Sequence, residues 1–291
     1  MGLRGDEATV TAPRPDGWHP RVVLRFIKAF PYSTTPVLVD TDCGEGYLKA
    51  LGNPQGPHAL ACELVGTSLA RKMRLPTLDF AIINVSKLDE IPLGKKRFAQ
   101  PGPAFITRKE TGASWGGKDT ELKMLANPED ISRLIVFDTW VLNCDRCHPD
   151  GNRRRPNYDN VFLSGEGARA GKFILKAIDH THCFDTIPDL TPRIAAIDRV
   201  KDARVYGRFP AFEPFVNMQG VARAAADLKA ITKGEVEEIV QSLPKEWQVN
   251  VQVRQSLVDL VFSRAPFVAD NILGWLGFLP LNCEDEGGGS P

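Results

Sequence analysis

The sequence has no net charge and no long apolar run. Its 291 residues contain 36 basic and 36 acidic side chains, so no overall electrostatic field favours binding to nucleic acid or to an anionic membrane. No apolar stretch approaches the roughly 20 residues that a membrane-spanning helix needs. The first twenty residues also lack the apolar segment of a secretory signal. These absences predict a cytoplasmic protein with no membrane partner and no direct nucleic-acid partner.

Cysteine is scarce as well, with six residues in the whole chain. Without an export signal, we expect reduced thiols. Cys144, Cys147 and His148 have the C-x-x-C-H spacing of a c-type haem attachment site, but that attachment normally follows export, which argues against haem. Together with a second group further along the chain, these residues could instead hold a tetrahedral zinc ion. The second group comprises His180, His182 and Cys183. A zinc-stabilised binding module therefore stays open as an alternative.

Strand patterns gather in the first third of the chain, and helical patterns dominate its second half. Residues 21–51 contain β-rich runs separated by turn residues, a helix is predicted over 58–75, and the pattern beyond about 190 is mostly helical. We therefore predict an α+β fold of two lobes, a β-rich N-lobe and a mainly helical C-lobe, with a cleft between them. The predicted boundaries are a flexible N-terminus (1–19), an N-lobe (20–110), a C-lobe (111–283) and a disordered tail (284–291).

Three charged residues stand where the local pattern favours an apolar side chain. Lys49 lies in the predicted strand GYLKAL, Glu63 in the predicted helix at ALACELVG, and Asp179 at the end of the predicted strand FILKAID. A charge in a half-buried position is costly unless it is paired or bound to an ion. Each side chain could instead extend into solvent, but the three together form a more specific set.

A polar motif follows the apolar helix predicted over 131–143. Residues 143–146 have the form N-x-D-R with Asp145 at its centre, and Asn160 precedes the predicted strand NVFL. In a nucleotide-dependent phosphotransferase, a lysine neutralises phosphates, a glutamate holds that lysine, and an aspartate accepts the proton of the attacking hydroxyl. An asparagine and a second aspartate bind Mg²⁺ through hard oxygen atoms. Such residues can be far apart in the sequence but must line one cleft.

Four segments of the sequence resemble the HipA-like kinases of bacteria, which have a protein-kinase-like fold. The segments are GYLKALGNPQGPHALACELVG (46–66), WVLNCDRCHP (140–149), NVFL (160–163) and LKAIDHTHCF (175–184). The resemblance covers roughly residues 20–190, and the helical remainder matches only in character.

The resemblance implies a role for each of the polar residues. Lys49 would contact the nucleotide phosphates, and Glu63 would pair with it. Asp145 would be the catalytic base, while Asn160 and Asp179 would bind the metal.

The turn around Gly44 and Gly46 resembles a reduced phosphate-covering loop. A plain hairpin turn explains both glycines equally well. The assignment of these two residues to nucleotide binding is therefore an expectation that rests on the resemblance.

One departure from protein kinases concerns the metal-binding asparagine, which usually follows the catalytic aspartate by five residues. The interval from Asp145 to Asn160 is much longer, so Asn152 or Asn157 is an alternative ligand. We favour Asn160 because it immediately precedes an apolar strand. The intervening run Arg153–Arg155 could dock an acidic substrate or a phosphate, or it could be part of a solvated loop.

The expected activity is ATP- and Mg²⁺-dependent phosphoryl transfer to Ser or Thr of a protein, as in a HipA-like serine/threonine kinase. The same fold can also transfer AMP, and fold alone does not decide the reaction. A pseudokinase would keep the fold without the chemistry, but competent residue types at all five positions argue against it. The resemblance also leaves room for an antitoxin-like or regulatory protein partner.

Overall fold

Alternating apolar residues and tight turns make the first third of the chain a β-sheet in the computed structural model, which describes residues 17–94, 96–151, 155–185 and 189–279. The sheet is antiparallel, with the strand order β1-β2-β3-β5-β4. At the tight turn between β2 and β3, Gly44 has a φ of +94°, which side chains of L-residues rarely adopt. The strands are β1 (Val23–Ala29), β2 (Val37–Thr41), β3 (Gly44–Lys49), β4 (Phe80–Val85) and β5 (Gly102–Arg108).

Helix α1 (Pro57–Lys72) connects β3 to β4 and corresponds to the helix predicted over 58–75. A proline occupies its first turn, where no backbone hydrogen bond is lost, and two basic residues lie in its last turn, where they complement the helix dipole. Twelve of its sixteen residues are buried, so α1 is covered on all sides rather than on one face.

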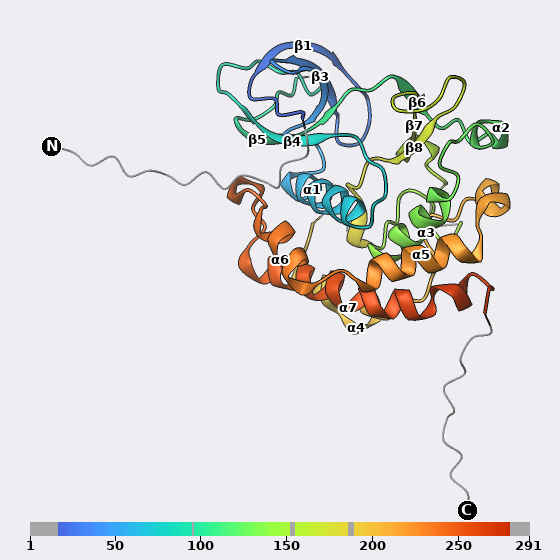
Figure 1. Ribbon diagram of the computed structural model, residues 1–291. Helices are drawn as coiled ribbons and strands as arrows, with labels where there is room; N and C mark the ends of the chain where they lie inside the picture. Colours follow the sequence, from blue (N-terminus) through green and yellow to red (C-terminus); the bar gives the residue numbers. More distant parts are fainter. Residues whose placement is uncertain (1–16, 95, 152–154, 186–188, 280–291) are drawn as a thin grey trace, which may run out of the picture.

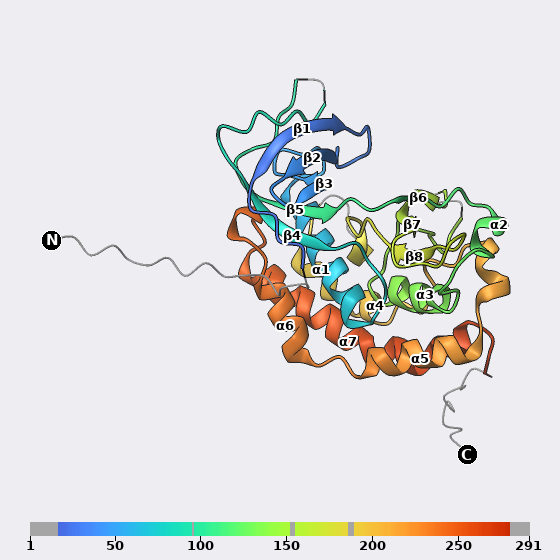
Figure 2. The same cartoon turned by 45° about the horizontal axis from the view of Figure 1, so that its top comes forward.

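The rest of the chain forms the mainly helical part, which lies below the sheet in Figure 1. This part begins with a small antiparallel sheet of the order β6-β7-β8. The long helix α7 runs along the side of the helical part that is opposite the five-stranded sheet (Figure 2). The elements are β6 (Gly112–Ser114), α2 (Asp119–Leu122), α3 (Asp130–Trp140), β7 (Val161–Ser164), β8 (Ile174–Ala177), α4 (Ile197–Val200), α5 (Met218–Lys229), α6 (Lys233–Gln241) and α7 (Val251–Trp275), with short 3-10 turns at Tyr158–Asn160 (η1), Cys183–Asp185 (η2), Pro192–Ala195 (η3), Pro210–Phe215 (η4) and Lys245–Trp247 (η5).

This arrangement confirms the predicted two-lobed α+β fold class. The predicted lobe boundary at 110 falls between the end of β5 and the start of β6 and stays a prediction. The predicted termini, 1–19 and 284–291, lie almost entirely outside the described residues. Within the described ranges, no helix combines the length and the apolar character needed to cross a membrane.

Two hydrophobic cores hold the chain together. The smaller core lies within the five-stranded sheet, around Val39, Leu48 and Ile106. The larger core unites α3, α5 and α7 with the apolar residues of α1. Strand β5 contributes to both cores, with Phe105 in the larger one and Ala104 and Ile106 in the smaller one.

Candidate active site

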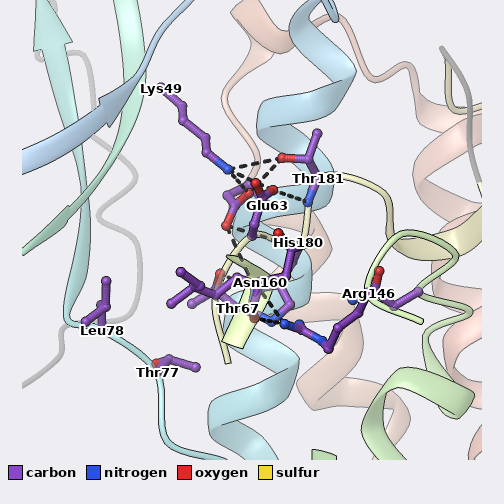
Figure 3. A network of polar contacts seen from close by, with 12 residues as sticks. Lys49, Glu63, Thr67, Thr77, Leu78, Arg146, Asn160, His180 and Thr181 are labelled. Carbon is purple, nitrogen blue, oxygen red and sulfur yellow. Dashed lines mark hydrogen bonds and ion pairs between the residues drawn. The ribbon is translucent and has the colours of Figure 1, made fainter. Parts of the chain in front are cut away.

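The three charged residues that interrupt apolar patterns meet in one cluster, and Figure 3 shows the pair of Lys49 and Glu63 within it. Lys49 ends β3, and its Nζ atom lies 2.6 Å from Oε2 of Glu63 in α1 and 3.0 Å from Oδ1 of Asp179, which follows β8. Glu63 is held further by the hydroxyl of Thr181, which donates to Oε2 at 2.9 Å, and by the backbone N–H of His180, which donates to Oε1 at 3.2 Å. The cluster therefore joins the sheet, α1 and the segment after β8.

The mutual attraction of Lys49 and Asp179 keeps both of these groups ionised. Burial alone would lower the pKa of Lys49, but the carboxylates of Asp179 and Glu63 outweigh it and raise that pKa above its ordinary value. Burial alone would likewise raise the pKa of Asp179, but Lys49 outweighs it and lowers that pKa below its ordinary value. Asp179 also has a φ of 56°, a left-handed conformation that is uncommon outside glycine and concentrates at functional sites.

Asp145 lies on the loop that follows α3. The chain leaves the helix through Leu142, which has a left-handed φ of 51°, and the side chain of Asn143 then accepts the backbone N–H of Asp145 at 3.3 Å. Oδ2 of Asp145 accepts two amide hydrogen bonds, from Nδ2 of Asn157 at 2.9 Å and from Nδ2 of Asn160 at 3.1 Å. The carboxylate is therefore fixed by its own loop and by the residues just before β7.

A buried ion pair supports this loop from beneath. Nε of Arg146 lies 2.8 Å from Oδ2 of Asp138 in α3, and both side chains are fully buried. Nη1 of Arg146 also donates to the backbone carbonyls of Asn160 and Ile178, the latter at 3.1 Å. The guanidinium thus connects the loop of Asp145 to the two segments that carry Asn160 and Asp179.

A cavity of about 740 Å³ lies in front of these residues. Its volume is within the range of pockets that hold a nucleotide-sized ligand. One part of the wall is apolar, with Leu78, Phe105 and Ile178, and another part carries polar groups. These polar residues include Lys49, Glu63, Asp145, Asn157, Asn160, Asp179 and His182. The same opening therefore offers a surface for a planar base and charged groups for phosphates.

Comparisons with known proteins agree with this geometry. A family model described as HipA-like kinase matches residues 32–265, a range that includes every polar residue of the cavity. The chain belongs to the HipA-like kinase family. Among solved structures, it is similar to the crystal structure of the Helicobacter pylori proinflammatory kinase CtkA, with a TM-score of 0.53 and 13% identity, over 87% of this chain and 99% of that chain. That likeness shows a shared fold, while a search of the curated proteins finds no match.

Membership of this family confirms the resemblance found in the sequence and makes the chain a kinase-type phosphotransferase. Membership of a kinase family implies that the protein uses ATP.

The predicted phosphate-covering glycines of this HipA-like kinase do not themselves line the cavity. Gly44 and Gly46 belong to the β2–β3 hairpin, and packing explains the second, because a Cβ there would lie 2.9 Å from the carbonyl oxygen of Thr107 on β5. The connection between β1 and β2, residues 30–36, contributes to the cavity wall instead, through Phe30–Ser33 and Pro36. No local pattern marks this loop as phosphate-covering, because it contains no glycine.

Two of the three candidate asparagines are described, and both lie at the cavity. Asn160 is buried, and its backbone carbonyl accepts from Arg146. Asn157 is half-buried, and its side-chain amide, like that of Asn160, donates a hydrogen bond to the carboxylate of Asp145. Asn152 lies outside the described residues, as do the first two arginines of the run at 153–155.

The six possible zinc ligands do not come together. Sγ of Cys144 donates to the carbonyl of His182, and Sγ of Cys147 donates to the carbonyl of Arg208. Burial raises the pKa of Cys147 to about 11 and that of Cys183 well above its ordinary value, whereas zinc binds thiolates. Within the part of the chain that the structure describes, no group of three or more His, Cys, Asp or Glu residues is arranged to hold a metal ion. The cysteine motif is therefore part of the packing around the loop of Asp145.

Proposed function

We propose that this HipA-like kinase transfers the γ-phosphoryl group of ATP, in the presence of Mg²⁺, to a serine or threonine hydroxyl of a protein. The observation that carries the proposal is the convergence of Lys49, Asp145 and Asp179 on one cavity. These residues come from a strand, a helix-terminal loop and a strand end that are far apart in the sequence. Their types match the tasks that phosphoryl transfer requires.

The N-terminal sheet supplies the nucleotide contacts in this proposal. The apolar wall formed by Leu78, Phe105 and Ile178 receives the base, because a planar heterocycle gains most where water is excluded. Lys49 neutralises the phosphates, and Glu63 keeps its ammonium group at the cavity. The β1–β2 loop, residues 30–36, is the segment that we propose to cover the phosphates in place of the glycine turn at 44–46.

Asp145 is the proposed catalytic base. Its carboxylate accepts the proton of the substrate hydroxyl while that oxygen forms a bond to the γ-phosphorus and the bond from this phosphorus to the β–γ bridging oxygen breaks. The products are the phosphorylated side chain and ADP. The two amide hydrogen bonds from Asn157 and Asn160 orient the carboxylate for this transfer.

The donor set fits a magnesium ion. Asn160 and Asp179 line the same cavity, and their side chains carry the hard oxygen atoms that Mg²⁺ prefers as ligands. We propose that these two residues hold the ion, which would neutralise charge on the phosphates when bound. The left-handed backbone of Asp179 is consistent with a residue whose position is constrained for ligation.

The label that ATP passes to a protein substrate tests the reaction type. ATP labelled in the γ-phosphate should transfer its label, and ATP labelled in the α-phosphate should not. Transfer of the α-label together with adenine would instead identify AMP transfer. The phosphorylated residue is then identified by mass spectrometry, which decides between Ser or Thr and other acceptors.

Two substitutions test the site itself. Asp145→Asn and Asp179→Asn should each lower phosphoryl transfer at least about 100-fold and leave the cooperative unfolding transition in place. The matched control is Asp198→Asn, an exposed aspartate in α4, which should retain full activity. If both site variants kept full activity, the assignment of the site would be wrong.

Location and partners are part of the same proposal. We propose a cytoplasmic enzyme that acts on a protein substrate, which the HipA-like kinase family supports, and that has an antitoxin-like or regulatory partner. Isolation of the protein with its partners from its own cell would identify such a complex.

A further inference from the structure

Helix α1, which carries Glu63, is built into the helical lobe rather than attached to the sheet alone. All residues from Ala59 to Ala70 are buried, which requires neighbours on every side of the helix. Its apolar residues share the larger core with α3, α5 and α7, whereas most of the sheet packs in the separate smaller core. The position of Glu63 is therefore determined largely by the helical lobe.

Contacts at both ends and in the middle fix α1 to that lobe. Near its start, Nδ1 of His58 accepts the backbone N–H of Leu190 at 3.0 Å. Near its end, Nζ of Lys72 lies 3.1 Å from Oε1 of Glu235 in α6. In the middle, Gly66 touches the segment after Asp179 so closely that a Cβ would lie 2.5 Å from Cβ of His180. No space remains for α1 to turn or slide at this contact.

The connector between α6 and α7, residues 245–248, reaches up to the sheet (Figures 1 and 2). Trp247 is fully buried in the larger core beside α1, and its Nε1 donates to the backbone carbonyl of Pro103 on β5 at 2.9 Å. The next residue, Gln248, offers its carbonyl to Nε2 of His58 at 3.3 Å. A single short segment thus contacts both β5 and α1.

These contacts are made by the strand next to Lys49 and by the helix that carries Glu63, the two residues of the ion pair. Pro103 lies two residues before Phe105, and Phe105 is the register partner of Lys49 on the neighbouring strand β3. Trp247 therefore holds the strand beside Lys49 with its indole N–H, and the short turn η5 that carries it packs against the helix of Glu63. A displacement of Trp247 would change the separation of Lys49 and Glu63.

We infer that Trp247 is a positioning residue that keeps the Lys49–Glu63 pair closed, so that this kinase does not regulate that pair by a swing of α1. This inference rests on the proposed function, which assigns Lys49 and Glu63 to nucleotide binding. Trp247 contributes no atom to the cavity wall, and it acts through the placement of β5 and α1.

The experiment combines Trp247→Leu with Glu63→Gln in a double-mutant cycle. In the wild-type background, Trp247→Leu should lower kcat/KM for ATP about tenfold. In the Glu63→Gln background, the same change should have less than about a twofold effect, because the pair it supports is already lost. Trp247→Phe, which keeps a ring in the core but loses the N–H donor, should recover part of the activity. Equal losses in both backgrounds would show a merely structural role and overturn the inference.

Hydrogen exchange provides a readout that does not depend on catalysis. Trp247→Leu should accelerate exchange of the α1 amides more than exchange of the α5 amides, which lie in the same core. The matched control is Trp275→Leu at the end of α7, which should leave α1 unchanged. If the wild-type chain transfers no phosphate, the proposed function fails while this exchange test still decides the role of Trp247. Equal acceleration of amide exchange in α1 and α5 would overturn the positioning role of Trp247.

Discussion

At the scale of single residues, the pair formed by Asp138 and Arg146 makes a prediction about pH. Burial raises the pKa of Asp138 to about 6, although the adjacent guanidinium of Arg146 acts in the opposite direction. Only the ionised carboxylate attracts Arg146, which in turn holds the carbonyls of Asn160 and Ile178. Phosphoryl transfer should therefore fall as the pH decreases through about 6, and Asp138→Asn should remove this limb of the pH–rate profile while lowering the plateau.

The same residue affects stability with the opposite sign. Its pKa in the folded state lies above the ordinary value of 3.8, so the folded protein binds the proton more tightly than the unfolded chain does. The stability contributed by this group is complete below about pH 4 and is lost as the pH rises to about 6. Urea unfolding of the wild type and of Asp138→Asn across this range measures it. A difference between the two proteins that does not change with pH would contradict the assignment.

Sequence reasoning reached some of these residues and missed others for a physical reason. Lys49, Glu63 and Asp179 could be selected because each interrupts an apolar pattern, and the structure brings the three together. Asp138 interrupts the apolar helix ISRLIVFDTW in the same way. It was missed because its partner, Arg146, lies on a loop whose path no local pattern determines. The functional roles of all these residues remain predictions.

At the scale of elements, Gly66 lies where α1 packs tightly against the segment after Asp179. Gly66→Ala would place a Cβ 2.5 Å from Cβ of His180. The better helix propensity of alanine, worth up to about 1 kcal/mol, should be outweighed by overpacking that costs about 1–3 kcal/mol. We expect lower stability in urea and a larger loss of transfer than of stability, because Asp179 is displaced.

A second glycine provides the control for that change. Gly234 lies in α6, and a Cβ there would meet no atom within 4 Å. Gly234→Ala should therefore raise the free energy of unfolding slightly and leave transfer unchanged. If both substitutions were equally harmless, the contact between α1 and His180 would be looser than the structure indicates.

The elements themselves were largely predictable, whereas their role at the cavity was not. Periodicity and turn residues predicted α1 and the β2–β3 hairpin. The β1–β2 loop could not be assigned to the cavity, because its position depends on how the sheet packs over the helical lobe. Glycine was the only local signal for a phosphate-covering loop, and it selected the turn at 44–46 rather than the loop at 30–36, which lines the cavity.

At the scale of the whole molecule, Glu110 connects the two sheets at the point where the chain passes from one lobe to the other. Its buried carboxylate lies 2.7 Å from Nζ of Lys176 in β8 and accepts from the hydroxyl of Ser164 in β7 at 2.6 Å. Arg108 at the end of β5 lies 3.4 Å from it. Removing one partner of such a buried group leaves the other charges without compensation.

Glu110→Ala should therefore lower the free energy of unfolding by about 3 kcal/mol, measured by urea denaturation. The matched control is Glu237→Ala, which removes an exposed i,i+4 pair with Lys233 in α6 and should cost less than about 0.5 kcal/mol. A loss at Glu110 no larger than that at Glu237 would show that the connection between the two sheets does not depend on this carboxylate.

The division of the chain between two cores limits how its lobes can be recombined. Residues before and after α1 pack with the sheet, whereas α1 packs with the helical lobe, so the chain passes from one core to the other and back before β5 ends. A chimera that exchanged residues 20–110 for those of a relative would import a foreign helix into the centre of the C-lobe. Productive crossovers should instead lie on each side of α1, near residues 53 and 75, so that the helix is inherited together with α3, α7 and Trp247.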